Sequence, residues 1–167
     1  MIWFTADWHL FHKNILRYEY RPYNSIQSMG EALIRNYNQN VKEDDTCFFL
    51  GDVFWGVQYE KARSLVGRLN GRKHLILGNH DEFRPFTYVE MGFESVHTSY
   101  RVQTSAGQLI LVHDPAPAGV FRDEAWLCGH VHSLFKYLPE KRVLNVGIDV
   151  WDYSPINIDT VEDMFDE

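Results

Sequence analysis

Five short apolar runs are spaced along the chain, and each is followed at once by polar residues. The runs are Ile2–Ala6, Cys47–Leu50, Leu75–Leu77, Leu109–Val112 and Ala125–Cys128. Short apolar runs bounded by turn residues are typical of buried β-strands. Because ligands bind beyond the carboxyl ends of the strands in open α/β sheets, we expect the polar residues after the five runs to meet at one site.

Two helical patterns separate the first three runs. Ser28 and Glu31 have the spacing of a capping box, which predicts a helix with Ser28 as its N-cap. About three helical turns are indicated by apolar residues at four-residue spacing, namely Met29, Leu33, Tyr37 and Val41. A second helix is predicted from Tyr59 to Leu69, ended by Asn70-Gly71. This alternation of strands and helices is typical of βαβ units and a mostly parallel sheet.

The second half of the chain has a different pattern, in which short strands are joined by turns. The predicted strands are Ser95–Thr104, Gln108–Val112, Trp126–Cys128, Phe135–Leu138 and Val143–Val146, with a turn at Ser105-Ala106-Gly107. Hairpins of this kind indicate antiparallel pairs, and therefore a mixed architecture with a second sheet. No linker interrupts the pattern, so we expect residues 1–167 to form a single domain.

The composition is that of a folded protein, with 45% hydrophobic and 23% charged residues. No apolar run approaches the ~20 residues that cross a bilayer, and Met1 leads into the first run without a basic flank or cleavage site. Cys47 and Cys128 lie inside apolar runs, which favours buried thiols over a disulfide. We therefore expect a cytoplasmic protein without a membrane partner.

The net charge of −7 argues against non-specific binding along a nucleic-acid backbone, which needs a basic stripe. Two divalent cations would offset part of this charge and concentrate positive charge in a cleft, which suits a small phosphate substrate better than a long polyanion. The aromatic share of 15% has two interpretations. Either large rings fill a small core, or Trp55, Trp151 and Tyr153 line a cleft in which a base or sugar stacks.

The residues after the first two runs are candidate metal ligands. Asp7 and His9 are two residues apart on a segment predicted to be extended, so their side chains point the same way and can hold one ion. Asp52 follows Gly51, whose missing side chain lets the backbone approach closely. The Asp52 carboxylate has two oxygens and can bridge two cations, although this residue alone would also fit a turn or a helix cap.

Gly78-Asn79-His80-Asp81 is the most specific of the motifs. Asn79 offers a neutral oxygen ligand, and His80, one residue further along the turn, should face the substrate. Asp81 could hold the other His80 ring nitrogen and fix its tautomer, and a purely structural turn is the alternative. Three histidines follow the last two runs, namely His113, His130 and His132. One such histidine is usually structural, but three beside the earlier residues indicate metal binding.

The order of these motifs resembles that of the calcineurin-like metallophosphoesterases. Asp-x-His, Gly-Asp, Gly-Asn-His-Asp, a lone His and Gly-His-x-His follow one another from Asp7 to His132. The C-terminal segment Asn145–Pro155 is similar to small stand-alone bacterial and phage members, whereas His113-Asp114-Pro115 departs from the pattern of many relatives. The resemblance implies a four-layer α/β sandwich, in which helices flank two mixed β-sheets and a dimetal site lies at the C-terminal ends of the strands.

The resemblance also implies a role for each motif. The first metal would be bound by Asp7, His9, Asp52 and His132, and the second by Asp52, Asn79, His113 and His130. Two such cations would activate a water for in-line attack near neutral pH, and His80 would stabilise charge or protonate the leaving oxygen. Mixed His, Asp and Asn ligands suit two divalent transition-metal ions better than Mg²⁺ or Ca²⁺; we expect Mn²⁺, with Fe²⁺, Ni²⁺ or Zn²⁺ as alternatives.

Polar residues near the first and third motifs are candidates for substrate binding, namely His12, Lys13, Asn14, Arg17, Arg21 and Arg84. Arginine suits bidentate recognition of phosphate, but each of the cations would also fit a solvated residue or a surface ion pair. His12 is the strongest of these candidates because it lies three residues from His9 in the same loop.

We therefore expect a phosphodiesterase that acts on a small nucleotide-like phosphate ester. The diester preference rests on short spans between the motifs and the lack of an obvious cap domain, which would leave the cleft open. The alternatives are a nuclease acting on nucleic-acid ends, a phosphomonoesterase, and a binding module that has lost catalysis. The charge offers no basic track for a nuclease, and every expected ligand position is filled, which disfavours the binding module.

Overall fold

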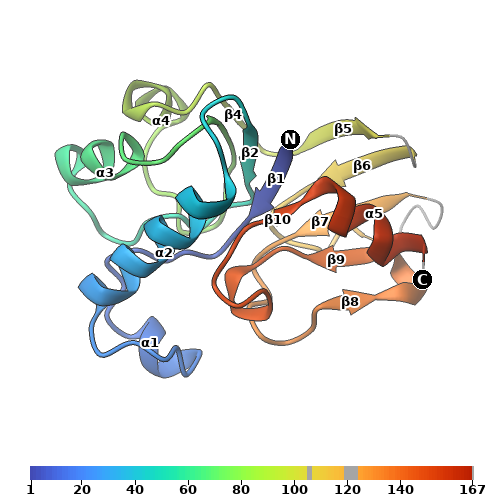
Figure 1. Cartoon of the computed structure of the whole chain (residues 1–167), viewed down its shortest axis with the longest axis horizontal. Coiled ribbons are helices and arrows are strands. Elements are labelled where there is room, and N and C mark those ends of the chain that lie inside the picture. The colour runs from blue at the N-terminus through green and yellow to red at the C-terminus, as the bar shows by residue number, and fades with distance from the viewer. Residues whose placement is uncertain (105–106, 119–123, 167) are drawn as a thin grey trace.

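The strands form two sheets that pack face to face. The structure is a computed structural model that describes residues 1–104, 107–118 and 124–166, and within these ranges each sheet has five strands (Figure 1). The order of strands is β10-β1-β2-β3-β4 in the first sheet and β5-β6-β7-β9-β8 in the second. The expected turn at Ser105-Ala106-Gly107 lies largely outside the described residues.

The first sheet is parallel except at one edge. Its strands are β1 (Ile2–Thr5), β2 (Thr46–Phe49), β3 (Arg72–Ile76), β4 (Ser95–His97) and β10 (Ile156–Asn157). Only β10 is antiparallel to its neighbour, β1. Cys47 and Phe49 pack toward the helices, whereas Phe48 packs toward the second sheet and stacks on Phe4. Burial of both faces explains why these strands are continuous apolar runs.

The second sheet is also mixed, as the hairpin pattern predicted. Its strands are β5 (Tyr100–Thr104), β6 (Gly107–Leu111), β7 (Ala125–Cys128), β8 (Tyr137–Leu138) and β9 (Val143–Asn145). β6, β7 and β9 are parallel, and β5 and β8 are antiparallel edge strands. The prediction of one strand over Ser95–Thr104 is wrong, because the chain leaves the first sheet after His97 and enters the second at Tyr100.

Helices flank the sheets, as expected. α2 (Ile26–Asn40), α3 (Tyr59–Val66) and α4 (Pro85–Met91) cover one face of the first sheet and share a core with it (Figure 1). α5 (Ile158–Asp166) packs beside β1 and β10, and α1 (Ile15–Tyr18) is a single turn. The short 3₁₀ helices are η1 (Pro139–Lys141) and η2 (Ile148–Val150). On the outer face of the second sheet, Trp126 belongs to a further apolar cluster, against which Phe135 and Leu138 pack.

The predicted start of α2 is wrong by three residues because Ser25, and not Ser28, is the N-cap. The backbone of Ser25 is extended, and its hydroxyl accepts a hydrogen bond from the Ser28 amide at 3.0 Å. The Ser28 hydroxyl in turn accepts from the Ser25 amide at 3.1 Å, so serine completes the capping box. Glu31 instead forms a surface ion pair with Arg68. The second helix, α3, ends at Val66, before the predicted Leu69, with Gly67 as its C-cap.

Two predictions about composition are also tested by the structure. Cys47 and Cys128 are buried free thiols, as predicted. Burial raises the pKa of both thiols, so they stay protonated at neutral pH. No helix within the described ranges is long and apolar enough to cross a membrane.

Candidate metal centre

The loops after five parallel strands meet at one end of the two sheets. Asp7 and His9 follow β1, Asp52 follows β2, and Asn79 follows β3. From the second sheet, His113 follows β6, and His130 and His132 follow β7. The strand ends that the apolar runs predicted are thus brought together by the parallel pairing of β1 with β2 and of β6 with β7.

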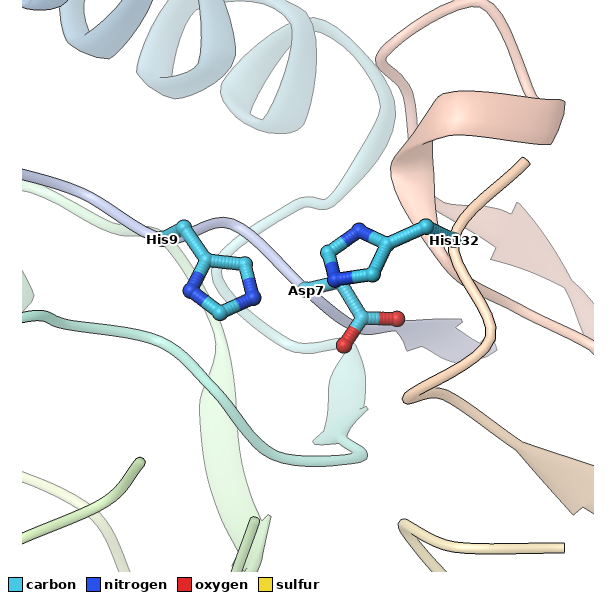
Figure 2. A group of neighbouring side chains, drawn as sticks. All are labelled: Asp7, His9 and His132. Atoms are coloured by element: carbon cyan, nitrogen blue, oxygen red, sulfur yellow. The ribbon is translucent and has the colours of Figure 1, made fainter. Parts of the chain in front are cut away.

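The first cluster consists of Asp7, His9 and His132, whose ligand atoms all lie within 4.8 Å of one another. Figure 2 shows the rings of His9 and His132 turned toward the Asp7 carboxylate. The two rings stack with their centroids 5.0 Å apart. Asp7 and His9 are buried, which leaves these side chains little room to turn away.

The second cluster joins Asp52, Asn79 and two histidines. Nε2 of His113 lies 3.4 Å from Oδ2 of Asp52 and 2.9 Å from Oδ1 of Asn79. Nδ1 of His130 lies 2.9 Å from the same Asn79 oxygen. The same Asp52 oxygen lies 3.5 Å from Nε2 of His9, so this carboxylate belongs to both clusters.

The backbone at these positions is left-handed. Positive φ angles between 47° and 70° occur at Asp7, His9, Asp52, His130 and His132. Non-glycine residues rarely adopt this conformation, and such residues gather at functional sites. The prediction of an extended segment at Asp7 is therefore wrong, because β1 ends at Thr5. The intervening Trp8 points into the core, where its indole donates to the Thr5 hydroxyl at 2.7 Å.

Glycines allow the loops to approach one another. A Cβ atom on Gly129 would lie 2.8 Å from the Leu50 carbonyl and 3.0 Å from Oδ2 of Asp7. Gly51 has a φ of +88°, and a Cβ atom there would collide with the His113 ring. Side chains at these two positions would fill the space in which the ligand atoms gather, which explains why glycine precedes Asp52 and His130.

The residues present fit a metal ion. Both ring nitrogens of His9 are buried and have no hydrogen-bond partner among the described residues. Burial lowers the pKa of His9 to about 3, so its ring is neutral and has a free lone pair. A buried polar atom without a partner is costly, and a cation beside Asp52 would remove this cost. The donor set of imidazole nitrogens and carboxylate and amide oxygens is that of a divalent metal site.

Comparison with known proteins decides the family. Residues 1–134, most of the chain, match the sequence model of the calcineurin-like phosphoesterases. The chain belongs to this family. It is therefore a metal-dependent phosphoesterase, and the family implies a dinuclear divalent metal site and a phosphate-ester substrate.

Relatives of this phosphoesterase have a similar length. An uncharacterized protein of Methanocaldococcus jannaschii is 31% identical over 96% of this chain and 88% of its own. The gene 66 protein of Mycobacterium phage L5 is 29% identical over 89% of this chain and 86% of its own.

Solved structures show the same fold. A protein of unknown function from Aquifex aeolicus aligns with a TM-score of 0.78 at 20% identity, covering 98% of both chains. Yfce, a phosphoesterase from E. coli, aligns with a TM-score of 0.51 at 15% identity, over 87% of this chain and 77% of its own.

Two histidines of the phosphoesterase are oriented by partners outside the clusters. Nδ1 of His113 donates to the Leu50 carbonyl at 2.7 Å, and Nδ1 of His132 donates to Oδ2 of Asp149 at 3.0 Å. Nε2 of each ring therefore remains directed at the cluster. Burial opposes the charged form of His113, but the carboxylates of Asp52 and Asp7 outweigh it and raise its pKa to about 9.

Asp81 does not hold the His80 ring, and that prediction is wrong. Its carboxylate accepts hydrogen bonds from the backbone amides of Gly78 (2.8 Å), Asp52 (2.9 Å) and Val53 (3.2 Å). Asp81 thus joins the loops after β2 and β3. The half-buried His80 is instead placed by packing, with its ring centroid 4.3 Å from that of Trp55.

Among the predicted substrate-binding residues, the structure brings only His12 against the site. Its ring stacks on Trp55 with centroids 4.1 Å apart and an interplanar angle of 15°. Asn14, Arg17 and Arg84 are exposed, and in the described part of the chain they make no side-chain hydrogen bond with the clusters, so their roles stay predictions. Lys13 is exposed as well.

Arg21 is not available to a substrate, so its predicted role is wrong. The residue is buried, and its guanidinium forms a bidentate ion pair with Asp149. Sequence analysis missed Asp149 as a partner of His132. The only sequence signal for Asp149 was that its segment, Asn145–Pro155, resembles small bacterial and phage members of the family. Nothing in the local pattern relates position 149 to positions 21 and 132.

Proposed function

We propose that this phosphoesterase hydrolyses a phosphodiester of a small nucleotide-like molecule. A row of rings beside the clusters carries the proposal. Centroid distances are 5.9 Å from Tyr18 to His12, 4.1 Å from His12 to Trp55, and 4.3 Å from Trp55 to His80. Tyr18 is 61% exposed and Trp55 is 37% exposed. Exposed rings beside a phosphate site suit a substrate that contains a base, because every base offers a face for stacking.

The ligands proposed for the two metals follow the two clusters. Asp7, His9, Asp52 and His132 would hold the first metal, and Asp52, Asn79, His113 and His130 the second. Mixed nitrogen and oxygen ligands support Mn²⁺, with Fe²⁺, Ni²⁺ or Zn²⁺ as alternatives. Such a pair of cations supplies Lewis-acid stabilisation of the phosphoryl oxygens and an activated water.

His80 is the proposed catalytic residue. Its backbone amide donates to Oδ1 of Asp52 at 2.9 Å, which ties its position to the carboxylate that both clusters share. Its ring is half-buried and packs against Trp55 and His9, with no side-chain hydrogen bond among the described residues. The ring nitrogens are therefore free to donate to a phosphoryl oxygen or to protonate the leaving oxygen.

The charges around the site favour a diester over a monoester. A monoester carries a second negative charge, which a free guanidinium would stabilise. Arg21 contacts the ligand loop after β1, but its donors are engaged with Asp149 and backbone carbonyls. Arg21 therefore has no donor left to stabilise the second negative charge of a monoester, which favours a diester with its single charge.

A substrate screen tests the proposal. Metal-stripped protein is reloaded with Mn²⁺ and assayed on bis-p-nitrophenyl phosphate, p-nitrophenyl phosphate, cyclic nucleotides and a labelled oligonucleotide. We expect a higher kcat/KM on the diesters and cyclic nucleotides than on the monoester. Preference for the monoester would contradict the diester assignment, cleavage from oligonucleotide ends would identify a nuclease, and no activity on any of the four would identify a binding module.

A pair of variants tests the role of the rings. Trp55→Ala should raise KM for a cyclic nucleotide, since stacking of one base contributes about 1–3 kcal/mol, whereas Trp55→Phe should keep most of the affinity. A glycerophosphodiester, which has no ring, is the control substrate, and its KM should not change. Equal effects of Trp55→Ala on both substrates would contradict base stacking.

A further inference from the structure

The guanidinium of Arg21 is buried and uses all five of its N–H donors. Nε and Nη2 donate to the two carboxylate oxygens of Asp149, each at 2.8 Å. Nη2 also donates to the Asp7 carbonyl at 2.7 Å, and Nη1 donates to the Trp8 carbonyl at 2.9 Å and to the Met29 sulfur at 3.5 Å. The Arg21 and Asp149 side chains are 0% and 2% exposed.

The Arg21 guanidinium therefore fixes two residues of the first cluster, Asp7 and His132, that lie far apart in the sequence. Arg21 binds the backbone of Asp7 directly. It reaches His132 through Asp149, whose Oδ2 accepts the Nδ1 hydrogen of the His132 ring at 3.0 Å. Both residues have left-handed backbones, with φ of 60° at Asp7 and 47° at His132, a conformation that persists only where surrounding contacts hold it.

We propose that Arg21 and Asp149 are positioning residues that preorganise the first metal site. Asp149 keeps the His132 proton on Nδ1, so that Nε2 presents its lone pair to the cluster, and Arg21 holds both Asp149 and the Asp7 backbone in place. This inference rests on the proposed function, because it takes Asp7 and His132 as metal ligands. The family match ends at residue 134, so Asp149 lies outside the part of the chain that the match covers.

Stability alone does not account for this ion pair. Taking two charges out of water costs about as much as their attraction returns, so the ion pair by itself is weak evidence for a role in stability. An apolar residue at position 149 would not accept the His132 hydrogen, however. Partners of this kind, behind a metal-binding histidine, contribute roughly 10–100-fold in metal affinity.

The chain contains a matched control for the ion pair. Arg68 forms a bidentate pair with Glu31 through Nη1 and Nη2, at 2.8 and 2.6 Å, whereas Arg21 binds Asp149 through Nε and Nη2. This second pair is exposed, with 47% and 62% of the side chains accessible, and it joins α2 to the segment after α3. Glu31→Gln therefore removes a bidentate ion pair without touching a proposed ligand.

The experiment measures Mn²⁺ binding by metal-stripped wild type, Asp149→Asn and Glu31→Gln with isothermal titration calorimetry. We expect two sites in the wild type and in Glu31→Gln. In Asp149→Asn, affinity should fall about 10–100-fold at one site and stay unchanged at the other. The Mn²⁺ concentration for half-maximal activity should rise, while kcat at saturating Mn²⁺ recovers. The ¹⁵N shifts of His132 in the metal-free protein, at a pH where its ring is neutral, should show the proton on Nδ1 in the wild type and a shift toward Nε2 in the variant.

Several outcomes would overturn the inference. The inference is contradicted if Asp149→Asn binds Mn²⁺ with wild-type affinity at both sites and His132 keeps its tautomer. It is also contradicted if Glu31→Gln loses as much Mn²⁺ affinity as Asp149→Asn. A wild type that binds fewer than two ions would instead contradict the proposed function, and the tautomer of His132 would still decide whether Asp149 orients it. If Asp149→Asn does not fold, the metal-free wild type decides the matter, because a neutral His132 ring with its proton on Nε2 contradicts the role of Asp149.

Discussion

The carboxylate of Asp81 accepts a hydrogen bond from the backbone amide of Asp52, at 2.9 Å. Through Gly78 and Val53 the same carboxylate joins the loops that follow β2 and β3. Burial raises the pKa of Asp81, and the amide hydrogen bonds oppose this rise. Asp81 therefore connects the backbones of two loops that carry proposed ligands, and its effect on the site is exerted through their positions.

Asp81→Asn should lower stability. The amide group keeps one acceptor but points an N–H donor at a buried backbone amide, which costs about 1–3 kcal/mol in the free energy of unfolding. Urea unfolding of the metal-free protein measures this loss. Asp114→Asn is the control, because Asp114 is an exposed carboxylate that accepts from the Ala116 amide at 2.8 Å, and it should change stability by less than about 0.5 kcal/mol. Unchanged stability with a large loss of kcat would mean that Asp81 acts in catalysis.

His80→Ala should keep both metals and lose turnover. The half-buried ring belongs to neither metal cluster, whereas loss of one proton donor lowers kcat by roughly 10²-fold or more. Elemental analysis and steady-state assays on bis-p-nitrophenyl phosphate check both parts. His97→Ala is the control, since the His97 ring contacts Ser95 and Tyr100, neither of which is a proposed ligand. Full turnover in His80→Ala would remove His80 from the mechanism.

Asp52→Asn should disturb both metal sites together. Its Oδ2 lies 3.5 Å from the His9 ring and 3.4 Å from the His113 ring, and a neutral amide cannot offer two anionic oxygens to two cations. Elemental analysis after dialysis against Mn²⁺ should find fewer than two ions per chain. The exposed Asp159 of α5 supplies the control variant, Asp159→Asn, which should retain two. Two ions retained in Asp52→Asn would contradict the bridging role.

Metal binding should release a proton from His113. Against the effect of burial, Asp52 and Asp7 raise the pKa of this ring from an ordinary 6.5 to about 9, and Nδ1 is held by the Leu50 carbonyl. The proton on Nε2 must therefore leave before this nitrogen binds a cation, so Mn²⁺ affinity should increase with pH up to about 9.

The same rise in the pKa of His113 makes the stability of the metal-free protein decrease as the pH increases. The raised pKa stabilises the folded state fully below pH 6.5, and this contribution is lost as the pH rises through about 9. The release of a proton on metal binding is measured by calorimetry of Mn²⁺ binding at pH 7.5, in buffers with different ionisation enthalpies. This experiment should show proton release that His113→Gln reduces. Identical binding enthalpies in all buffers would contradict the prediction.

Strand ends were predictable from sequence because each apolar run is buried on both faces and stops where polar residues begin. That pattern placed Asp7, Asp52 and His113 at one end of the sheets. It could not predict the left-handed backbone at Asp7 and His132, because side-chain type alone does not reveal a strained φ angle that distant contacts maintain.

Features that depend on long-range contacts were also missed. Arg21 resembled a free cation, since its partner Asp149 is 128 residues away in the sequence. α4 was missed although Pro85 at its start and Gly92 at its end are ordinary helix signals, because the helix is short. The start of α2 was misplaced because two serines compete as N-cap, and only the backbone shows that Ser25 is the extended one.

The return of the chain to β1 has a consequence for shortened versions of the protein. β10 pairs with β1 at Trp3 and Phe4, and Gly147 forms a bridge with Ala6, the neighbour of Asp7. An expressed fragment that stops at residue 134, where the family match ends, would contain every proposed ligand without the segment that holds them.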